Sequence, residues 1–201
     1  MKNPKREQLI LAKDVGAFPV LETNRLVLRQ IEKDDASSIL IYLSDKEVMK
    51  YYGLEPFKTI KEALSEISWY RSIRNKRIGI RWGITLKGKN EVIGSCGFFN
   101  MVPRHYRTEI GYELHRNYWG QGIASEALEA IVRYGFESMN IQRMEALIEP
   151  LNISSQRLAE KQGFLREGLL RSYEFTRDKF DDLYMYALLK QGFDKLHKDK
   201  D

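Results

Sequence analysis

Residues 114–125 read Leu-His-Arg-Asn-Tyr-Trp-Gly-Gln-Gly-Ile-Ala-Ser and lie between two regular patterns. The residues before them alternate like a strand, and the residues after them carry apolar side chains at the spacing of an amphipathic helix. Gly120 and Gly122 permit positive φ angles and a close approach of ligand atoms to the backbone. Such a loop leaves backbone N–H groups unpaired at the positive end of the helix dipole, which favours binding of a phosphate.

Two other interpretations of this loop stay open from the residues alone. In the first, the glycines only reverse the chain between the strand and the helix. In the second, the loop is a dinucleotide-binding fingerprint, although that motif has Gly or Ala where Ser125 stands and belongs to a repeated βαβ unit. A Walker loop is excluded, because the sequence contains no Gly-Lys-Ser or Gly-Lys-Thr.

The rest of the chain reads as strands and helices around this loop. Strands are predicted for residues 26–31, 78–86, 91–101, 106–114, 143–149, 164–175 and 180–189. Helices are predicted from Asp34 or Asp35, after Thr59, over residues 123–136, and from Asn152 to near Gly163. This order predicts an α+β fold (α/β, three-layer), with a mixed, mostly antiparallel sheet of about seven strands flanked by about four helices.

The length and composition indicate one ordinary globular domain. The chain has 201 residues, of which 43% are apolar and 30% charged. We expect an N-terminal extension over residues 1–18, a folded domain over residues 19–192 and a polar C-terminal tail over residues 193–201. The formal net charge of +5 lies partly in the two ends, so a basic stripe that reads nucleic acid is not expected.

One cationic cluster interrupts the middle of the chain. No acidic residue occurs among residues 71–81, which hold Arg71, Arg74, Lys76, Arg77 and Arg81. In one interpretation these cations complement the dipole at a helix C-terminus. In the other they form a site for phosphate or for an acidic partner.

Other kinds of site find little support in the sequence. The chain holds a single cysteine, Cys96, so an internal disulfide is excluded, and its apolar strand predicts a packed thiol. The three histidines are scattered, so no metal site is predicted. No apolar run approaches the ~18 residues of a membrane span. Together these features favour a cytoplasmic protein without a membrane partner.

The glycine loop resembles the pyrophosphate-binding motif of the GNAT superfamily of N-acetyltransferases, Arg/Gln-x-x-Gly-x-Gly/Ala. Trp119 takes the first place of the motif, Gly122 the fourth and Ala124 the sixth. Trp119 departs from the usual Arg or Gln, but Tyr-Trp-Gly-x-Gly-x-Ala is similar to the version in the ribosomal-protein N-terminal acetyltransferases of the RimJ/RimL type. Further segments resemble that branch, at residues 21–26, 109–112, 152–155, 161–164, 167–168 and 181–184.

The resemblance covers roughly residues 20–190 and implies an enzyme that binds acetyl-CoA as co-substrate. Backbone groups of Tyr112, Glu113 and Leu114 would hold the pantetheine arm and the thioester, and Asn152 would contact the same arm. The pyrophosphate would lie against Trp119, Gly120, Gln121, Gly122, Ile123, Ala124 and Ser125.

The same resemblance supplies candidates for the chemistry, in which an amine attacks the thioester carbonyl. This reaction needs an uncharged amine, a stabilised oxyanion and a protonated leaving thiolate. Glu174 matches the base of the ribosomal-protein branch, and Glu109 matches the base position of other GNAT enzymes. Ala159 stands where many GNAT enzymes have an acidic tyrosine. Ser155 matches a serine of the branch and is therefore the candidate acid, and a cofactor contact as well.

These residues predict an N-acetyltransferase that passes an acetyl group to a primary amine by direct attack. The first hypothesis for the acceptor is the N-terminal α-amine of a ribosomal or other protein. The second is a small amine, such as a polyamine, an aminoglycoside or an amino-acid-like compound. The third hypothesis is a CoA-binding module without turnover. Exposed strand edges in this fold also allow a homodimer.

Overall fold

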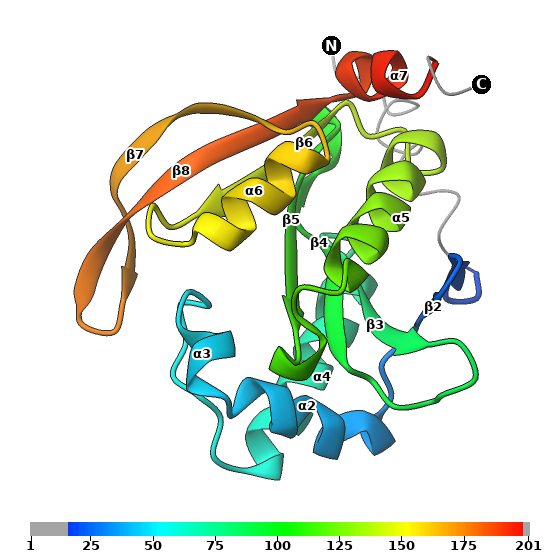
Figure 1. Cartoon of the computed structure of the whole chain (residues 1–201), viewed down its shortest axis with the longest axis vertical. Helices are drawn as coiled ribbons and strands as arrows, with labels where there is room; N and C mark the ends of the chain where they lie inside the picture. The colour runs from blue at the N-terminus through cyan, green and yellow to red at the C-terminus, as the bar shows by residue number, and fades with distance from the viewer. Residues whose placement is uncertain (1–15, 199–201) are drawn as a thin grey trace.

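Eight strands form one sheet in the order β1-β2-β3-β4-β5-β6-β8-β7 (Figure 1). The computed structural model describes residues 16–198 of the chain. The strands are β1 (Leu21–Glu22), β2 (Leu26–Arg29), β3 (Ile80–Leu86), β4 (Gly94–Val102), β5 (Arg107–Leu114), β6 (Arg143–Ile148), β7 (Leu165–Thr176) and β8 (Lys179–Leu189). Strands β5 and β6 pair in parallel and the other neighbours pair antiparallel. The predicted mixed, mostly antiparallel sheet is confirmed, and β1 adds a strand too short to show a periodic pattern.

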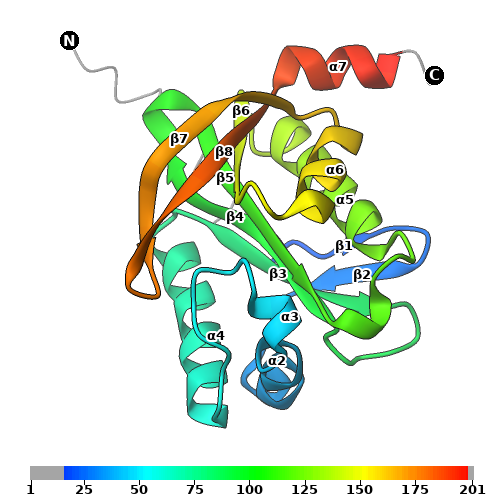
Figure 2. The ribbon, with the colours of Figure 1, turned by 60° about the vertical axis from the view of Figure 1, so that its left-hand side comes forward.

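Helices cover both faces of the sheet and make three layers. The α-helices are α2 (Ala36–Leu43), α3 (Lys46–Met49), α4 (Ile60–Asn75), α5 (Ile123–Glu137), α6 (Ile153–Lys161) and α7 (Lys190–Lys198), and the 3-10 turns are η1 (Lys33–Asp35), η2 (Pro103–His105) and η3 (Arg116–Tyr118). Figure 2 shows α5 and α6 on one face and α2, α3 and α4 on the other. The four predicted helices are present, and α3, a single turn, was not predicted.

Local sequence signals set the helix ends. Thr59 and Glu62 form a capping box at the start of α4, in which each side chain accepts from the backbone of the other. Asn152 caps α6, because its side-chain oxygen accepts from the Ser155 amide at 3.1 Å. Gly163 follows the end of α6 with a φ of 88°, a left-handed conformation that glycine adopts without strain.

The apolar core lies on both faces of the central strands. Trp82 of β3 is fully buried, and its ring contacts Phe98 at 5.8 Å and Tyr134 of α5 at 5.5 Å between centroids. Phe18 packs edge-on against the same ring at 5.9 Å, and the Pro19 carbonyl accepts from the Trp82 indole N–H at 2.7 Å. The segment next to β1 is therefore tied to the core, whereas residues 1–15 of the predicted extension lie outside the described residues.

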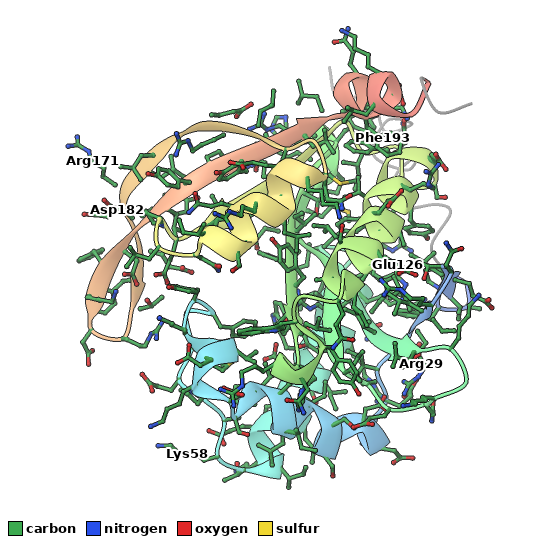
Figure 3. The ribbon with its side chains drawn as sticks, viewed as in Figure 1. Arg29, Lys58, Glu126, Arg171, Asp182 and Phe193 are labelled. Carbon is green, nitrogen blue, oxygen red and sulfur yellow. The ribbon has the colours of Figure 1, made fainter. Side chains whose placement is uncertain are left out.

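The C-terminal tail predicted from residue 193 instead begins inside helix α7. Phe193 is only 3% exposed, and its ring lies 5.0 Å from the ring of Phe136 in α5. Figure 3 shows Phe193 beneath α7, on the side of α5. The folded region therefore extends beyond residue 192. The prediction missed the helical spacing of Leu189, Phe193 and Leu196, because charged residues dominate the composition of this segment.

Strands β5 and β6 part from each other after a short pairing. Arg107, Thr108 and Glu109 of β5 pair with residues 143–145 of β6, and beyond Glu109 no further pair forms. Strand β6 continues alongside β8 as far as Ile148, while β5 continues alongside β4 as far as Leu114. The edge of β5 that faces β6 therefore has no strand partner over residues 110–114, and its backbone groups are available to a ligand.

Close approach between β3 and β4 depends on Gly97. A Cβ added there would lie 2.2 Å from the Ile80 carbonyl oxygen and 2.7 Å from Arg81 Cα, both of them backbone atoms that cannot move aside. We predict that Gly97→Ala lowers the free energy of unfolding by about 2 kcal/mol or more. Equilibrium unfolding in urea measures this change.

Gly168→Ala is the matched control, because Gly168 also lies in a strand and a Cβ there meets nothing within 4 Å. This control should change the free energy of unfolding by less than about 0.5 kcal/mol. Equal stabilities of the two variants would show that the β3–β4 spacing does not require a glycine.

Candidate active site

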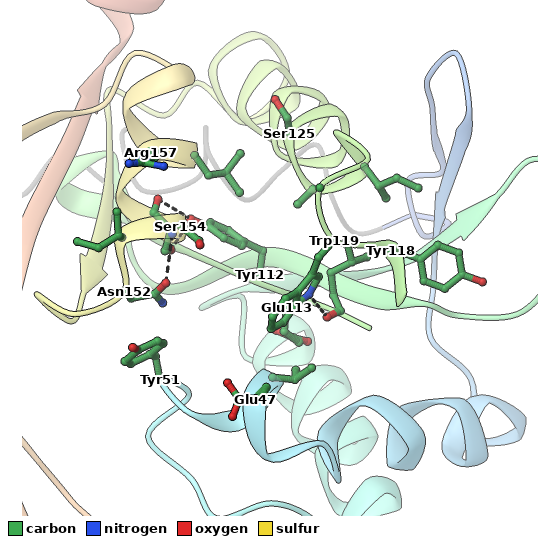
Figure 4. Close-up of a pocket in the computed structure, with 18 of the residues that line it drawn as sticks. Glu47, Tyr51, Tyr112, Glu113, Tyr118, Trp119, Ser125, Asn152, Ser154 and Arg157 are labelled. Atoms are coloured by element: carbon green, nitrogen blue, oxygen red, sulfur yellow. Dashed lines mark hydrogen bonds between the residues drawn. The ribbon is translucent and has the colours of Figure 1, made fainter. Parts of the chain in front are cut away.

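A cavity of about 640 Å³ opens where β5 and β6 part, between the N-terminal ends of α5 and α6 (Figure 4). It collects most of the residues that the sequence assigned to the cofactor. These are Tyr112, Glu113, Leu114, Trp119, Gly120, Gly122, Ile123, Ala124, Ser125, Asn152 and Ser155. The glycine loop, the free edge of β5 and the start of α6 thus face one space, although they are separated in the sequence.

The glycine loop has the geometry of an anion site. Gly120 and Gly122 have φ angles of 73° and 74°, which side chains with a Cβ adopt only with strain. Gly122 precedes the first turn of α5, and no side chain caps that helix. Because Ile123, Ala124 and Ser125 also line the cavity, the unpaired first-turn amides lie beside it. The site therefore presents backbone donors and the positive end of a 15-residue helix.

Trp119 closes the loop onto the end of β5. Its indole N–H donates to the Leu114 carbonyl at 2.7 Å, and its side chain is 47% exposed at the cavity. The Leu114 carbonyl therefore already has one partner from the chain. The hydrogen bond from the Trp119 indole holds the loop against β5 without a charged side chain. A tryptophan can therefore stand where the related motif has Arg or Gln.

Gln121, also assigned to the cofactor, is not among the residues that line the cavity. Its side-chain amide donates to the Asn117 carbonyl at 2.8 Å, and its own carbonyl accepts from Arg25 at 2.9 Å. Arg25 also forms a 2.6 Å ion pair with Glu126 in the first turn of α5. The role of Arg25 was not predicted from the sequence. Its guanidinium lies beside Gly122, and its contacts with Gln121 and Glu126 join the start of β2 to the glycine loop.

A pair of hydroxyl groups crosses the cavity between β5 and α6. The Tyr112 hydroxyl lies 2.6 Å from Ser155 Oγ, where either group can donate. Burial raises the pKa of Tyr112 to about 12, so its hydroxyl stays protonated at neutral pH. Sequence reasoning expected only the backbone of Tyr112 to act. The structure shows that its side chain holds Ser155, the candidate acid.

The side chain of Glu113 turns to the opposite face of the sheet. There it forms an ion pair with Arg81 and accepts from the Ser95 hydroxyl, and the side chains of both charged partners are 3% exposed. Burial raises the pKa of Glu113, and the Arg81 guanidinium acts in the opposite direction. Only a backbone contact was expected of Glu113. Its buried ion pair was not visible in the sequence, because Arg81 lies 32 residues away.

The two candidate bases are not among the residues that line the cavity. Glu109 belongs to the last β5–β6 pair and accepts from the Asn100 side chain at 3.2 Å. Burial raises the pKa of Glu109, and the charges of Glu145 and Glu174 raise it further. Glu174 is exposed on β7, where its carboxylate lies 3.8 Å from the position of a Cβ on Gly53.

The loop between α3 and α4 bridges the cavity and was not recognised from the sequence. The Tyr51 hydroxyl donates to the Leu151 carbonyl at 3.2 Å, and Figure 4 shows Tyr51 below Asn152 at the same end of the cavity. Arg177, in the turn between β7 and β8, donates to the Lys50 carbonyl at 2.9 Å. These contacts join three loops that are distant in the sequence, so no local pattern could have predicted them.

Within residues 16–198, no group of three or more His, Cys, Asp or Glu side chains is arranged to hold a metal ion. None of the described helices is long and apolar enough to cross a membrane. Cys96 is fully buried, as predicted, and burial raises the pKa of its thiol to about 12. A reactive thiolate is therefore not part of this site.

Comparison with known proteins places these features in one family. Residues 25–165 match the family model described as "Acetyltransferase (GNAT) domain". The chain is 40% identical over 173 residues to an uncharacterized N-acetyltransferase, YoaA, of Bacillus subtilis (strain 168), which covers 86% of this chain and 98% of the relative. It is 27% identical over 180 residues to the [ribosomal protein uS5]-alanine N-acetyltransferase of Escherichia coli (strain K12), covering 84% and 89% of the two chains.

A solved structure shares the fold at lower identity. The ribosomal L7/L12 α-N-protein acetyltransferase RimL, in complex with coenzyme A, superposes with a TM-score of 0.76 at 21% identity. The match covers 85% of this chain and 98% of that one. At this identity the likeness shows the fold only.

The indole of Trp119 gives a direct test of the loop. We predict that Trp119→Phe weakens acetyl-CoA binding about fivefold, because it removes one hydrogen bond that fixes the loop and keeps an aromatic ring. Isothermal titration calorimetry measures the change. Trp69→Phe is the control, since Trp69 is exposed on α4 and does not line the cavity. Equal affinities of both variants would contradict a role for the Trp119–Leu114 contact.

Proposed function

The chain belongs to the GNAT acetyltransferase family, and from that premise we propose that its acceptor is the N-terminal α-amine of a peptide or protein, such as a ribosomal protein. The family membership makes the chain an acetyl-CoA-dependent N-acetyltransferase. The acceptor, and the role of each residue, are inferences from the site.

The observation that carries the acceptor proposal is the bridge over the cavity. The Tyr51–Leu151 and Arg177–Lys50 contacts span the side that the acceptor must approach. A chain terminus is slender and extended, so it reaches past these two contacts more easily than a lysine side chain on a folded surface. The relative that acetylates an alanine of ribosomal protein uS5 supports the same class of acceptor.

The chemistry also favours an α-amine over a lysine side chain. An α-amine has a pKa near ~8 and lysine near ~10.4, so freeing lysine of its proton at pH 7 costs roughly 3 kcal/mol more. An N-terminal acceptor therefore needs only a modest base. A carboxylate with a pKa raised by burial, such as Glu109, meets this need better than a fully solvated one.

The residues present fit acetyl-CoA. The first-turn amides of α5 and the glycine loop offer donors for the pyrophosphate, and Arg157 and Lys161 of α6 add positive charge to the cavity. The free edge of β5 over Tyr112, Glu113 and Leu114, with Asn152 opposite, offers backbone groups for the pantetheine arm. Acetyl-CoA, when bound, supplies an acetyl group activated as a thioester.

In this proposal Glu109 accepts the proton of the attacking amine, and Glu174 attracts the acceptor in its charged form. Glu109 lies where β5 and β6 part, whereas Glu174 lies on the β7–β8 hairpin, close to Gly53. Ser155 donates a hydrogen bond to the leaving sulfur, and the Tyr112 hydroxyl, 2.6 Å away, orients the Ser155 hydroxyl. The CoA thiolate leaves with this hydrogen bond and takes up a proton from water. A thiolate with a pKa near ~8.5 needs little more than such a hydrogen bond.

A second candidate acceptor is a small cationic amine. Three carboxylates, Glu109, Glu149 and Glu174, interact electrostatically on the acceptor side. Burial and the neighbouring acidic side chains raise the pKa of Glu149, and a nearby polyamine would relieve that repulsion. Polyamines and aminoglycosides are therefore included among the acceptors to be tested.

The acceptor is tested by release of the CoA thiol from acetyl-CoA in the presence of different amines. The panel holds peptides that begin with Ser, Ala or Thr, the same peptides with a blocked N-terminus and an internal lysine, and spermidine or an aminoglycoside. We expect turnover with the free N-termini and none with the blocked peptides. Turnover confined to the small amines would contradict the N-terminal proposal and favour the second candidate.

The base is tested by Glu109→Gln and Glu174→Gln. We predict that Glu109→Gln lowers kcat about a hundredfold or more and leaves the KM for acetyl-CoA unchanged. The wild-type kcat/KM should fall as the pH drops through the raised pKa of Glu109, because a protonated carboxyl cannot accept a proton. That acidic limb should disappear in Glu109→Gln.

Glu174→Gln should mainly raise the KM for the acceptor, and Glu129→Gln, an exposed change on α5, should alter neither constant. A hundredfold loss of kcat in Glu174→Gln, with Glu109→Gln fully active, would transfer the role of base to Glu174.

A further inference from the structure

A second cavity of about 330 Å³ lies beside the C-terminal end of α4, apart from the acetyl-CoA cavity. It gathers three arginines of the cationic cluster noted in the sequence, two from α4 and one from β3. Phe18 and Ile31 supply its apolar lining, and its polar lining is Gln30, Tyr70, Arg71, Arg74, Asn75 and Arg81. No carboxylate belongs to that lining among the described residues.

Two donors at this cavity lack a partner among the residues that the structure describes. They are the buried Nε atoms of Arg71 and Arg74. Each arginine uses one terminal nitrogen elsewhere: Arg71 pairs with Glu32, and Arg74 donates to the Gly16 carbonyl at 3.1 Å. Buried donors without partners are rare, so two of them around one cavity indicate that a ligand completes them.

The helix dipole alone does not explain this arrangement. Arg74 stands in the last turn of α4, where a cation is favourable. That effect requires neither a buried Nε nor the approach of Arg81 from another element. The negative end of the α4 dipole also opposes an anion, so the guanidinium groups must outweigh it.

The chemistry of the lining fits a phosphate group. Guanidinium groups offer planar, paired donors that match phosphate oxygens, and the Phe18 ring lies 5.1 Å from the Arg74 guanidinium and holds its plane. The side-chain amides of Gln30 and Asn75 can donate and accept hydrogen bonds. They can therefore bind polar groups that the molecule carries besides its phosphate. We propose that this cavity binds a small phosphate-bearing anion, at a site separate from that of acetyl-CoA.

The two cavities share one ion pair. Arg81 lines the anion cavity, and its partner Glu113 lines the acetyl-CoA cavity. An anion that binds to Arg81 weakens the ion pair between Arg81 and Glu113. Glu113 belongs to the part of β5 that has no strand partner on the β6 side. Binding in the anion cavity therefore changes the affinity for acetyl-CoA. This coupling rests on the family assignment, whereas the anion site itself does not depend on the acceptor.

Binding is tested by calorimetry on the full chain saturated with CoA, so that the acetyl-CoA cavity is already filled. The probes are inorganic phosphate, pyrophosphate, AMP and, as a carboxylate without phosphorus, citrate. We expect pyrophosphate or AMP to bind to the CoA-saturated protein. We expect the double variant Arg71→Gln/Arg74→Gln to weaken that binding about tenfold or more.

Two controls separate the site from general charge and from misfolding. Arg133→Gln removes an exposed arginine of α5 and should leave binding unchanged. Arg71→Lys/Arg74→Lys keeps the charge but loses the paired donors, so it should bind more weakly than wild type and more tightly than the Gln variant. Each variant without ligand should show a cooperative thermal unfolding transition well above the assay temperature, which excludes misfolding as the cause of weaker binding.

Three results would overturn the proposal. Absence of heat from every phosphate probe once CoA is saturating would show that phosphates enter only the acetyl-CoA cavity. Equal affinity of wild type and the Gln double variant would place the anion elsewhere, and equal or tighter binding of citrate would overturn the phosphate class.

Tighter binding of AMP than of inorganic phosphate would identify a nucleotide rather than the free ion as the source of the phosphate. The coupling predicts about a fivefold change in the KM for acetyl-CoA that disappears in the Gln double variant. An unchanged KM with measurable anion binding would leave the site standing and remove the coupling.

Discussion

The early end of the parallel pairing between β5 and β6 is the constraint on which the rest of the site depends. The two strands stay together only as far as Glu109 and Glu145, after which β6 follows β8 and β5 follows β4. Backbone groups in a sheet interior normally satisfy one another. Here a row of them on β5 is left for a ligand, and the loop that follows delivers the N-terminus of α5 to the same place. A linear thioester cofactor with a pyrophosphate finds both kinds of contact in one cavity.

The buried Arg81–Glu113 pair connects the two faces of this arrangement. Burial of two charges is costly, and removal of one partner from such a pair typically costs 3–5 kcal/mol. Ser95 satisfies a further position of the carboxylate, and the Tyr70 ring lies 5.6 Å from the guanidinium. The strand that carries the cofactor edge is thereby anchored to β3 and α4 by an interaction that tolerates little change in geometry. Glu113 lines the larger cavity, and Arg81 lines the smaller one.

Much of the fold was predictable from the sequence because its signals are local. The Thr59–Glu62 capping box, the Asn152 cap and the glycine loop each lie within a few residues, and long strands show their period directly. The short elements β1 and α3 were missed from the periodic pattern, and α7 was assigned to a tail because charged residues dominate its composition. Within the site, the motif predicted most of the segments that line the cavity, with Gln121 as an exception. The Tyr112–Ser155 hydroxyl pair, the bridging Tyr51 and the Glu113 ion pair were not, because tertiary packing brings these residues together.

Hydrogen exchange with and without CoA tests most directly whether the parted strands and the glycine loop hold the cofactor. Amides that gain a hydrogen-bond partner or lose contact with water exchange more slowly. The account predicts slower exchange in the amides of residues 112–114 and 120–126 on saturation with CoA, with little change in the exposed outer strand β7. Protection confined to other segments, or none at saturating CoA, would contradict the placement of the cofactor and the account that depends on it.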